Sequence, residues 1–276
     1  RPPISTLLPY TTLFRSTGCS AGNGGVTEIK PGAAQDCSSG CAYLTIGQSN
    51  GYPLILPKGV AVDGQGNVWF TSDGCVSGSS CTPNSAGVVE ITAADVQAGA
   101  CNQCVIYSNN NTATGNIAEP AGVAADSLGN IWVANGCGPA NCFDYFGGSV
   151  TEIRKGAATD CTSGCIDFAE SGIFQPAGVA VDNSGNIWVT DPTLPGVTEI
   201  TSAAATAGAC GISSCVNFNT GDSTGSLAID TSNDVWVVRS TDNSLLEILP
   251  GASADCSSGC IRMSLPFTPL DVAVKK

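Results

Sequence analysis

The residues of this chain with the clearest chemistry are its cysteines. There are fifteen, and fourteen of them form couples with two to five residues between the partners. Couples at this spacing form either local disulfides or zinc sites. A zinc site needs two converging couples, often with histidine, and this sequence has no histidine. We therefore interpret the couples as disulfides, and only Cys19 has no near neighbour. The couples are Cys37/Cys41, Cys75/Cys81, Cys101/Cys104, Cys137/Cys142, Cys161/Cys165, Cys210/Cys215 and Cys256/Cys260.

Two sets of acidic residues recur at matching places along the chain. The first set is Glu28, Glu90, Glu152, Glu199 and Glu247, and the second is Asp63, Asp126, Asp182 and Asp230. A catalytic group occurs once, whereas these groups return in every unit. We expect them to be architectural and look for function in residues that break the repeat.

Composition excludes several classes of function. The formal charge is −13, with 10 Lys and Arg against 23 Asp and Glu, so binding to phosphate backbones or anionic membranes is disfavoured. No apolar run approaches the roughly 18 residues of a membrane span. Fifteen cysteines are typical of an oxidising compartment. We expect a secreted, periplasmic or cell-surface bacterial protein that is monomeric.

A sequence repeat organises most of the chain. Its clearest copy reads Pro-Ala-Gly-Val-Ala-Val-Asp at 176–182, followed by Gly-Asn-Ile-Trp-Val at 185–189. Related copies begin at 57, 120 and 225, and all four tryptophans occupy the same repeat position. Each copy predicts a narrow strand, an Asp-x-x-Gly-Asn hairpin turn and a strand that carries Trp. A third strand such as 150–153 and a fourth that starts at a cysteine complete the unit.

Four-stranded units of this length, with no helical period, predict an all-β β-propeller. We expect complete blades at about 57–119, 120–175, 176–223 and 224–268. Residues 17–56 supply a third and a fourth strand, and residues 269–276 supply a first strand. This pattern resembles NHL-repeat propellers, and its Trp-containing form is similar to the streptogramin B lyase branch. The resemblance covers residues 17–276 and implies fold far more strongly than function.

The first sixteen residues differ from the rest, because they contain no Asp, Glu or Gly. Residues 8–16 are similar to a translated sequencing adapter, so we interpret 1–16 as non-native sequence of metagenomic origin. The partner of Cys19 would fall within that segment. The cysteine loops also alternate between two types, which indicates duplication of a two-blade unit. We hypothesise that the natural propeller has six blades.

Positions that break the repeat fall where propellers usually bind, on the loops that join second to third and fourth to first strands. We expect these side chains to meet near the mouth of the central channel. The candidates are Lys58, Ser72, Asp73, Glu119, Asn135, Gln175, Asp191 and Arg239.

The resemblance to streptogramin lyases implies a histidine base and a divalent metal, and no residue here inherits that histidine. We therefore expect a binding or scaffold module for a protein or glycan, without a cofactor, a metal site or catalytic residues. The alternative is a lyase- or lactonase-like enzyme with Ca²⁺ or Mg²⁺ at the channel mouth. Glu119, Asn135 and Asp191 would then imitate a cation cluster.

Overall fold

The fold is described from a computed structural model, in which residues 13–17, 25–30, 34, 38–45, 57–72, 86–99, 104–108, 117–136, 147–169, 173–210, 215–239 and 241–274 are placed. These ranges hold strands and two short helices. In chain order the elements are β1 (Leu13–Thr17), β2 (Gly25–Ile29), β3 (Cys41–Thr45), β4 (Pro57–Val62), β5 (Val68–Ser72), β6 (Gly87–Ile91), α1 (Ala93–Ala98), β7 (Val105–Tyr107), β8 (Pro120–Ala125), β9 (Ile131–Asn135), β10 (Ser149–Ile153), β11 (Cys165–Phe168), β12 (Gly178–Val181), β13 (Ile187–Asp191), β14 (Gly196–Ile200), α2 (Ser202–Ala207), β15 (Cys215–Asn219), β16 (Leu227–Ile229), β17 (Val235–Arg239), β18 (Ser244–Ile248) and β19 (Cys260–Ser264).

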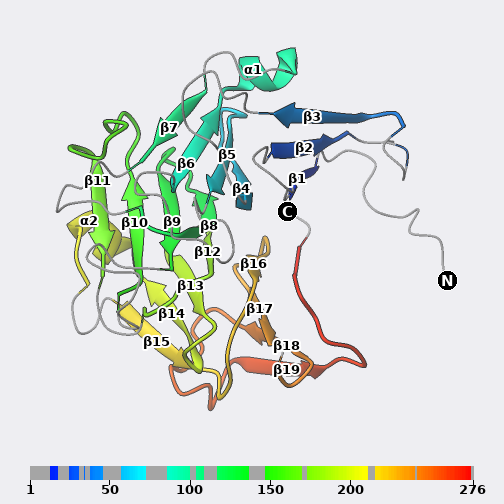
Figure 1. Ribbon diagram of the computed structural model, residues 1–276. Helices are drawn as coiled ribbons and strands as arrows, with labels where there is room; N and C mark the ends of the chain where they lie inside the picture. The colour runs from blue at the N-terminus through cyan, green and yellow to red at the C-terminus, as the bar shows by residue number, and fades with distance from the viewer. Residues whose placement is uncertain are drawn as a thin grey trace.

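The strands form separate antiparallel sheets arranged around one axis (Figure 1). Four sheets have four strands each, in the orders β4-β5-β6-β7, β8-β9-β10-β11, β12-β13-β14-β15 and β16-β17-β18-β19. The first strands of successive sheets, β4, β8, β12 and β16, contact one another around the axis. This is a β-propeller of four complete blades, as the sequence predicts.

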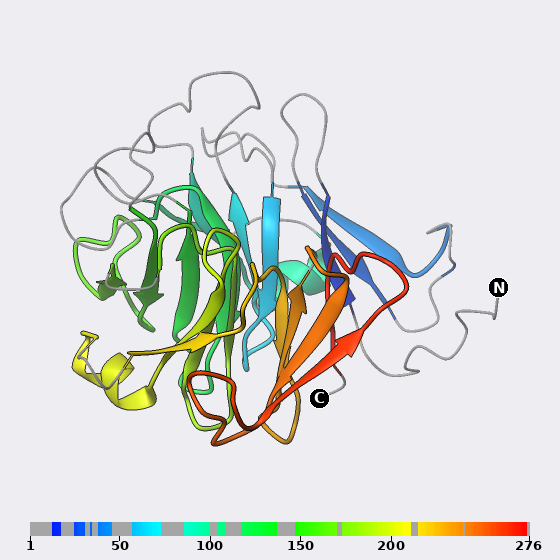
Figure 2. The ribbon, with the colours of Figure 1, turned by 90° about the horizontal axis from the view of Figure 1, so that it is seen from below.

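The two ends of the propeller carry different connections. Second strands lead to third strands, and fourth strands to first strands, at one end, which we call the loop end. The turns between first and second strands lie at the other, the turn end, where Figure 2 also shows α2. At these turns Gly66, Gly129 and Gly185 have φ between +79° and +87°, a conformation that favours glycine.

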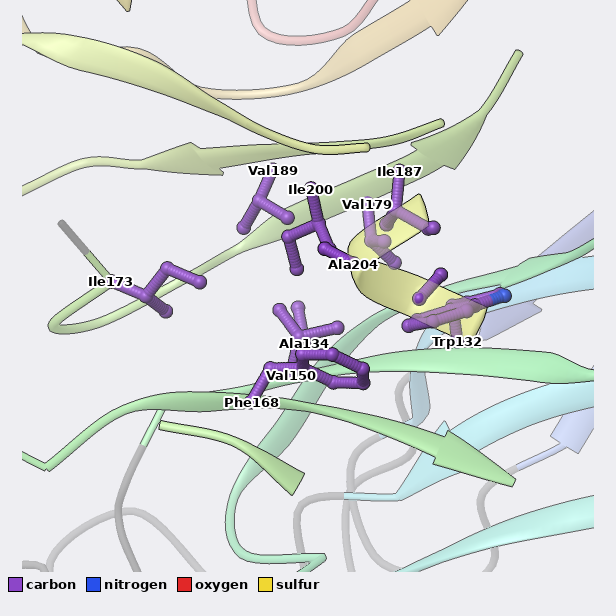
Figure 3. Packing of buried hydrophobic residues seen from close by; sticks show 11 residues of the cluster. Trp132, Ala134, Val150, Phe168, Ile173, Val179, Ile187, Val189, Ile200 and Ala204 are labelled. Carbon is purple, nitrogen blue, oxygen red and sulfur yellow. The ribbon is translucent and has the colours of Figure 1, made fainter. Parts of the chain in front are cut away.

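Each blade buries its tryptophan against the next blade. Trp132 of β9 packs with Phe168 of its own sheet and with Val179 and Ile187 of the following sheet (Figure 3). The ring centroids of Trp132 and Phe168 lie 5.5 Å apart, and Trp69–Tyr107 and Trp188–Phe218 repeat the arrangement. Aromatic pairs at such separations contribute beyond their buried area. The inter-blade contacts are therefore the main core of the fold.

The last blade departs from this rule. Trp69, Trp132 and Trp188 are 5%, 1% and 7% exposed, whereas Trp236 is only partly buried. Met263 takes the register position that an aromatic ring holds in the three blades before it. No following blade covers Trp236 in the part of the chain that the structure places.

Two of the described loops contain short helices that were not predicted. α1 and α2 occupy the two Ala-rich connections between third and fourth strands. The side chains of Thr92 and Thr201 cap their first turns, and Gly99 and Gly208 end them in the left-handed conformation. A six-residue helix is too short for a hydrophobic period, so only the Thr and Gly caps signalled it.

Three of the expected cysteine couples are disulfides in the structure, namely Cys161–Cys165, Cys210–Cys215 and Cys256–Cys260. Cys41 and Cys104 are disulfide-bonded as well. The remaining cysteines, Cys19, Cys37, Cys75, Cys81, Cys101, Cys137 and Cys142, lie outside the described residues.

The terminal segments differ from expectation. Leu13–Thr17, within and next to the segment interpreted as non-native, pairs with β2 in the place of a second strand, with Phe14 opposite Glu28 as Trp132 is opposite Glu152. The segment 269–274 was expected to be a first strand, and this is wrong, since it forms no strand.

The failure of 269–274 to form a strand has a steric reason. A Cβ at Gly59 would lie 2.6 Å from the carbonyl oxygen of Ala121, so first strands need glycine or a very small residue where neighbours approach. Asp271 stands at that repeat position. Its carboxylate instead contacts the hydroxyl of Ser226.

Candidate binding site at the loop end

The recurring aspartates build the turn end of each blade. In the first complete blade, one oxygen of Asp63 accepts from the backbone N–H groups of Gln65 and Asn67, each at 2.9 Å. Its other oxygen accepts from the side-chain amide of Asn67 and from the indole nitrogen of Trp69, also at 2.9 Å. Asp126 and Asp182 repeat all four bonds. These carboxylates are saturated structural acceptors.

The recurring glutamates face the tryptophans across the sheet, as Glu199 faces Trp188. Burial raises the pKa of Glu199, and the nearby charge of Asp182 raises it further. Burial also raises the pKa of Glu90 and of Glu247, with aspartate charges as the second cause. Because the same shift returns in several blades, it is a property of the repeat and does not mark one residue as a catalytic acid.

The candidates at the ends of the second strands are Ser72, Asn135, Asp191 and Arg239, and the structure buries all four. They were expected to meet at the channel mouth. They do not line the cavity on the axis, because each is buried at the end of the second strand of its own blade. A polar side chain at the end of a buried strand can reach the backbone of an adjoining loop, and Asp191 does so. Asn135 instead contacts a side chain of the third strand, and Arg239 contacts two aspartates.

Asp191 shows this anchoring most completely. One carboxylate oxygen accepts from the backbone N–H groups of Phe174 and Gln175 at 2.7 and 2.8 Å. The other accepts from the backbone N–H and hydroxyl of Thr193 at 2.8 and 2.6 Å. One side chain thus fixes both loops of its blade at the loop end.

Arg239 and Asn135 contact other side chains, and each has one buried polar atom without a hydrogen-bond partner among the described residues. Arg239 forms ion pairs with Asp242 at 3.0 Å and Asp222 at 3.7 Å, and its Nε is buried without a hydrogen-bond partner among the described residues. The amide nitrogen of Asn135 donates to Thr151 Oγ1 at 2.8 Å, and its Oδ1 is buried and unbonded within the same part of the chain.

The other candidates lie at the starts of blades. Lys58 is exposed, and Glu119 has φ +46° with its carbonyl accepting from the N–H of Gly136. Gln175 contributes its backbone N–H to Asp191. Asp73 lies outside the described residues. Lys58 is the one among them that borders the axis.

The axis holds a cavity of about 670 Å³. The same triplet of each first strand lines it, namely 58–60, 121–123, 177–179 and 225–227, together with Asp271. Lys58 is its basic residue, at a position where the other triplets have alanine or glycine, and Asp271 is its acidic residue. Asp271 and Ser226 were not predicted as site residues, because the pattern of 269–276 is that of an ordinary first strand.

These features define the chain as a β-propeller, and comparisons with known proteins agree. Virginiamycin B lyase from Staphylococcus aureus, solved with quinupristin, superposes with a TM-score of 0.58 at 11% identity, over 95% of this chain and 78% of that chain. The propeller in a nidogen/laminin complex gives 0.61 at 14% identity, over 96% and 82%. The expected likeness to streptogramin-lyase-like propellers is confirmed at the level of fold.

A third similar structure is the extracellular domain of a hybrid two-component system from B. thetaiotaomicron. It matches with a TM-score of 0.56 and 15% identity, over 91% of this chain and 30% of that chain. No family model and no curated protein matches the sequence. None of the described helices is long and apolar enough to cross a membrane.

Proposed function

We propose that this propeller is an exported binding module that takes a protein or glycan at its loop end, over the mouth of the axial cavity. The observation that carries the proposal is the anchoring by Asp191, whose four hydrogen bonds fix two loops of one blade. Because Asp191 already holds these two loops, they lose little conformational entropy on binding.

Export is supported by the disulfides, which persist in oxidising compartments. The nidogen/laminin structure is a propeller in complex with another protein, and the B. thetaiotaomicron domain is extracellular. Their likeness to this chain is one of fold, so the ligand is proposed from the site alone.

Lys58 gives the proposed site its chemical character. It is an exposed cation at the rim of the cavity in a chain of formal charge −13, and the equivalent positions Ala121, Ala177 and Gly225 are uncharged. The ammonium group of Lys58 offers hydrogen-bond donors to ligands that present carbonyl, hydroxyl or carboxylate oxygens.

The test is a glycan array and a displayed-peptide library probed with the wild type, Lys58→Glu and Lys30→Glu. Lys30 is also exposed but follows a third strand at the turn end, so it matches Lys58 in charge and exposure. We expect Lys58→Glu to lose the wild-type hits and Lys30→Glu to keep them. Equal loss in both variants, or in neither, would exclude the loop end.

The enzymatic alternative is tested separately, by thermal melting with Ca²⁺ or Mg²⁺. It requires Asp191 to bind a cation, although both its oxygens already accept two hydrogen bonds. We expect neither ion to change the melting temperature of the wild type or of Asp191→Asn. A rise in the wild type that Asp191→Asn abolishes would favour the enzyme.

A further inference from the structure

A basic pair at the turn end also breaks the repeat. Arg154 and Lys155 follow the third strand of the second complete blade. At the position of Arg154 the other complete blades have Thr92, Thr201 and Leu249, and the first, partial blade has Lys30. Among the described residues no other two basic residues are adjacent, in a chain of formal charge −13.

Arg154 lies between two pockets, one at each inter-blade boundary of its blade. The larger is about 530 Å³ and runs from the turn of Asp126 to α2 and the turn at 183–185. The smaller is about 210 Å³ and also includes Lys155. Arg154 lines both pockets.

The fold does not require this arginine. Its Nε donates to Glu152 Oε2 at 3.1 Å, but Glu90, Glu199 and Glu247 occupy the equivalent position in blades with no arginine there. The Arg154 side chain stays 42% exposed, and only Nε has a hydrogen-bond partner among the described residues. The terminal nitrogens therefore present N–H donors in the fork geometry that suits a carboxylate.

The walls of the larger pocket fit a sugar. Ser127, Ser184 and Ser202 bring hydroxyl groups to it, and each can donate and accept. Leu128 is 76% exposed at its edge and offers an apolar surface to the C–H face of a pyranose ring. Most of the residues that line this pocket are polar, which suits a ligand that carries several hydroxyl groups.

We propose that this pocket binds an acidic sugar, a hexuronate residue of a polysaccharide, with its carboxylate on Arg154. Glu152 competes with the ligand for the same guanidinium. The site lies at the opposite end of the molecule from Lys58 and stands independently of the function proposed above.

The probe is trigalacturonate, measured by calorimetry on the full chain, with its methyl ester, a sulfated trisaccharide and inorganic phosphate as comparison ligands. We expect Arg154→Gln to weaken trigalacturonate binding by roughly tenfold or more, the loss of a hydrogen bond to a charged group. Lys30→Gln, the same repeat position in another blade, should bind as the wild type does. Both residues are exposed enough for the variants to fold, and thermal melts check this.

Glu152→Gln gives the sharper readout, because it removes the carboxylate that competes with the ligand for Arg154. If Glu152 only supported the blade, its substitution would not be expected to improve binding. We expect it to tighten trigalacturonate binding severalfold. The proposal is overturned if the wild type does not bind the probe or if Arg154→Gln binds it equally well. Equal affinity for the methyl ester, or for sulfate or phosphate groups, would overturn the assignment to a uronate.

Discussion

The indole nitrogen of Trp69 donates to the carboxylate of Asp63 over 2.9 Å, between residues six positions apart. The bond joins the turn of a blade to the ring that fills the space before the next blade. Trp132, Trp188 and Trp236 repeat it with their own aspartates at 3.1–3.2 Å. The most regular part of the sequence thus couples hairpin geometry to packing between blades.

Asp63→Ala should therefore destabilise the protein markedly. The substitution removes four hydrogen bonds to a largely buried carboxylate and leaves the indole N–H without its acceptor. We expect the free energy of unfolding to fall by about 2–4 kcal/mol. Urea denaturation measures it, with Gln65→Ala, an exposed residue of the same turn, as the control. An unchanged midpoint for Asp63→Ala would refute the assignment.

Glu199→Gln should stabilise the protein near neutral pH. The folded pKa of Glu199 lies above its ordinary value of 4.5, because burial and then the charge of Asp182 disfavour the ionised form. The contribution of Glu199 to stability is thus complete below its unfolded pKa and is lost as pH rises through the folded pKa. Glutamine avoids that loss, so the variants should differ at pH 7 and converge in acid.

Glu152→Gln is the matched control, because the charge of Arg154 opposes the effect of burial on the pKa of Glu152. It should stabilise less than Glu199→Gln in the same thermal melts across pH. If Glu199→Gln is instead less stable than the wild type at neutral pH, then the ionised carboxylate has a favourable interaction that outweighs the free-energy cost of its burial.

Two disulfides with the same spacing, Cys161–Cys165 and Cys256–Cys260, should contribute differently to the free energy of unfolding. Closing so short a loop is worth about 2 kcal/mol in the chain-entropy model. Cys161 is also buried in the core between two blades, next to Trp69 and Ile131, whereas Cys256 lies in the last blade and outside the buried core. Removing Cys161 and Cys165 together should cost more than removing Cys256 and Cys260. Equal costs in denaturant titration would contradict the packing role.

Trp236 should be the tryptophan most open to solvent. We expect acrylamide to quench one fraction of the fluorescence readily and the rest weakly, and Trp236→Phe to remove the readily quenched fraction. Trp132→Phe, which removes a fully buried ring, should leave that fraction in place. If the readily quenched fraction persists in Trp236→Phe, Trp236 is shielded from solvent and the prediction is wrong.

The propeller was predictable because hairpin turns and strand order are local. The Asp-x-x-Gly-Asn turn recurs in three of the four complete blades, and Asp230 with Asn233 takes its place in the last, so the hairpins could be predicted from the sequence alone. The place of each loop-end side chain depends on contacts between segments that are far apart in the sequence, so Asp191 was predicted to reach the channel and instead binds the backbone of Phe174 and Gln175. Arg154 was not predicted as a site residue, since it follows an ordinary third strand and its pockets form only where two blades pack together.

Hydroxyl-radical footprinting of the protein with a ligand selected on the array tests the proposed binding end directly. We predict protection at Lys58 and Leu194, which lie at the loop end, and none at Leu128 or Lys155 at the turn end. Protection confined to Leu128 and Lys155 would contradict a loop-end site and place binding at the Arg154 pocket instead.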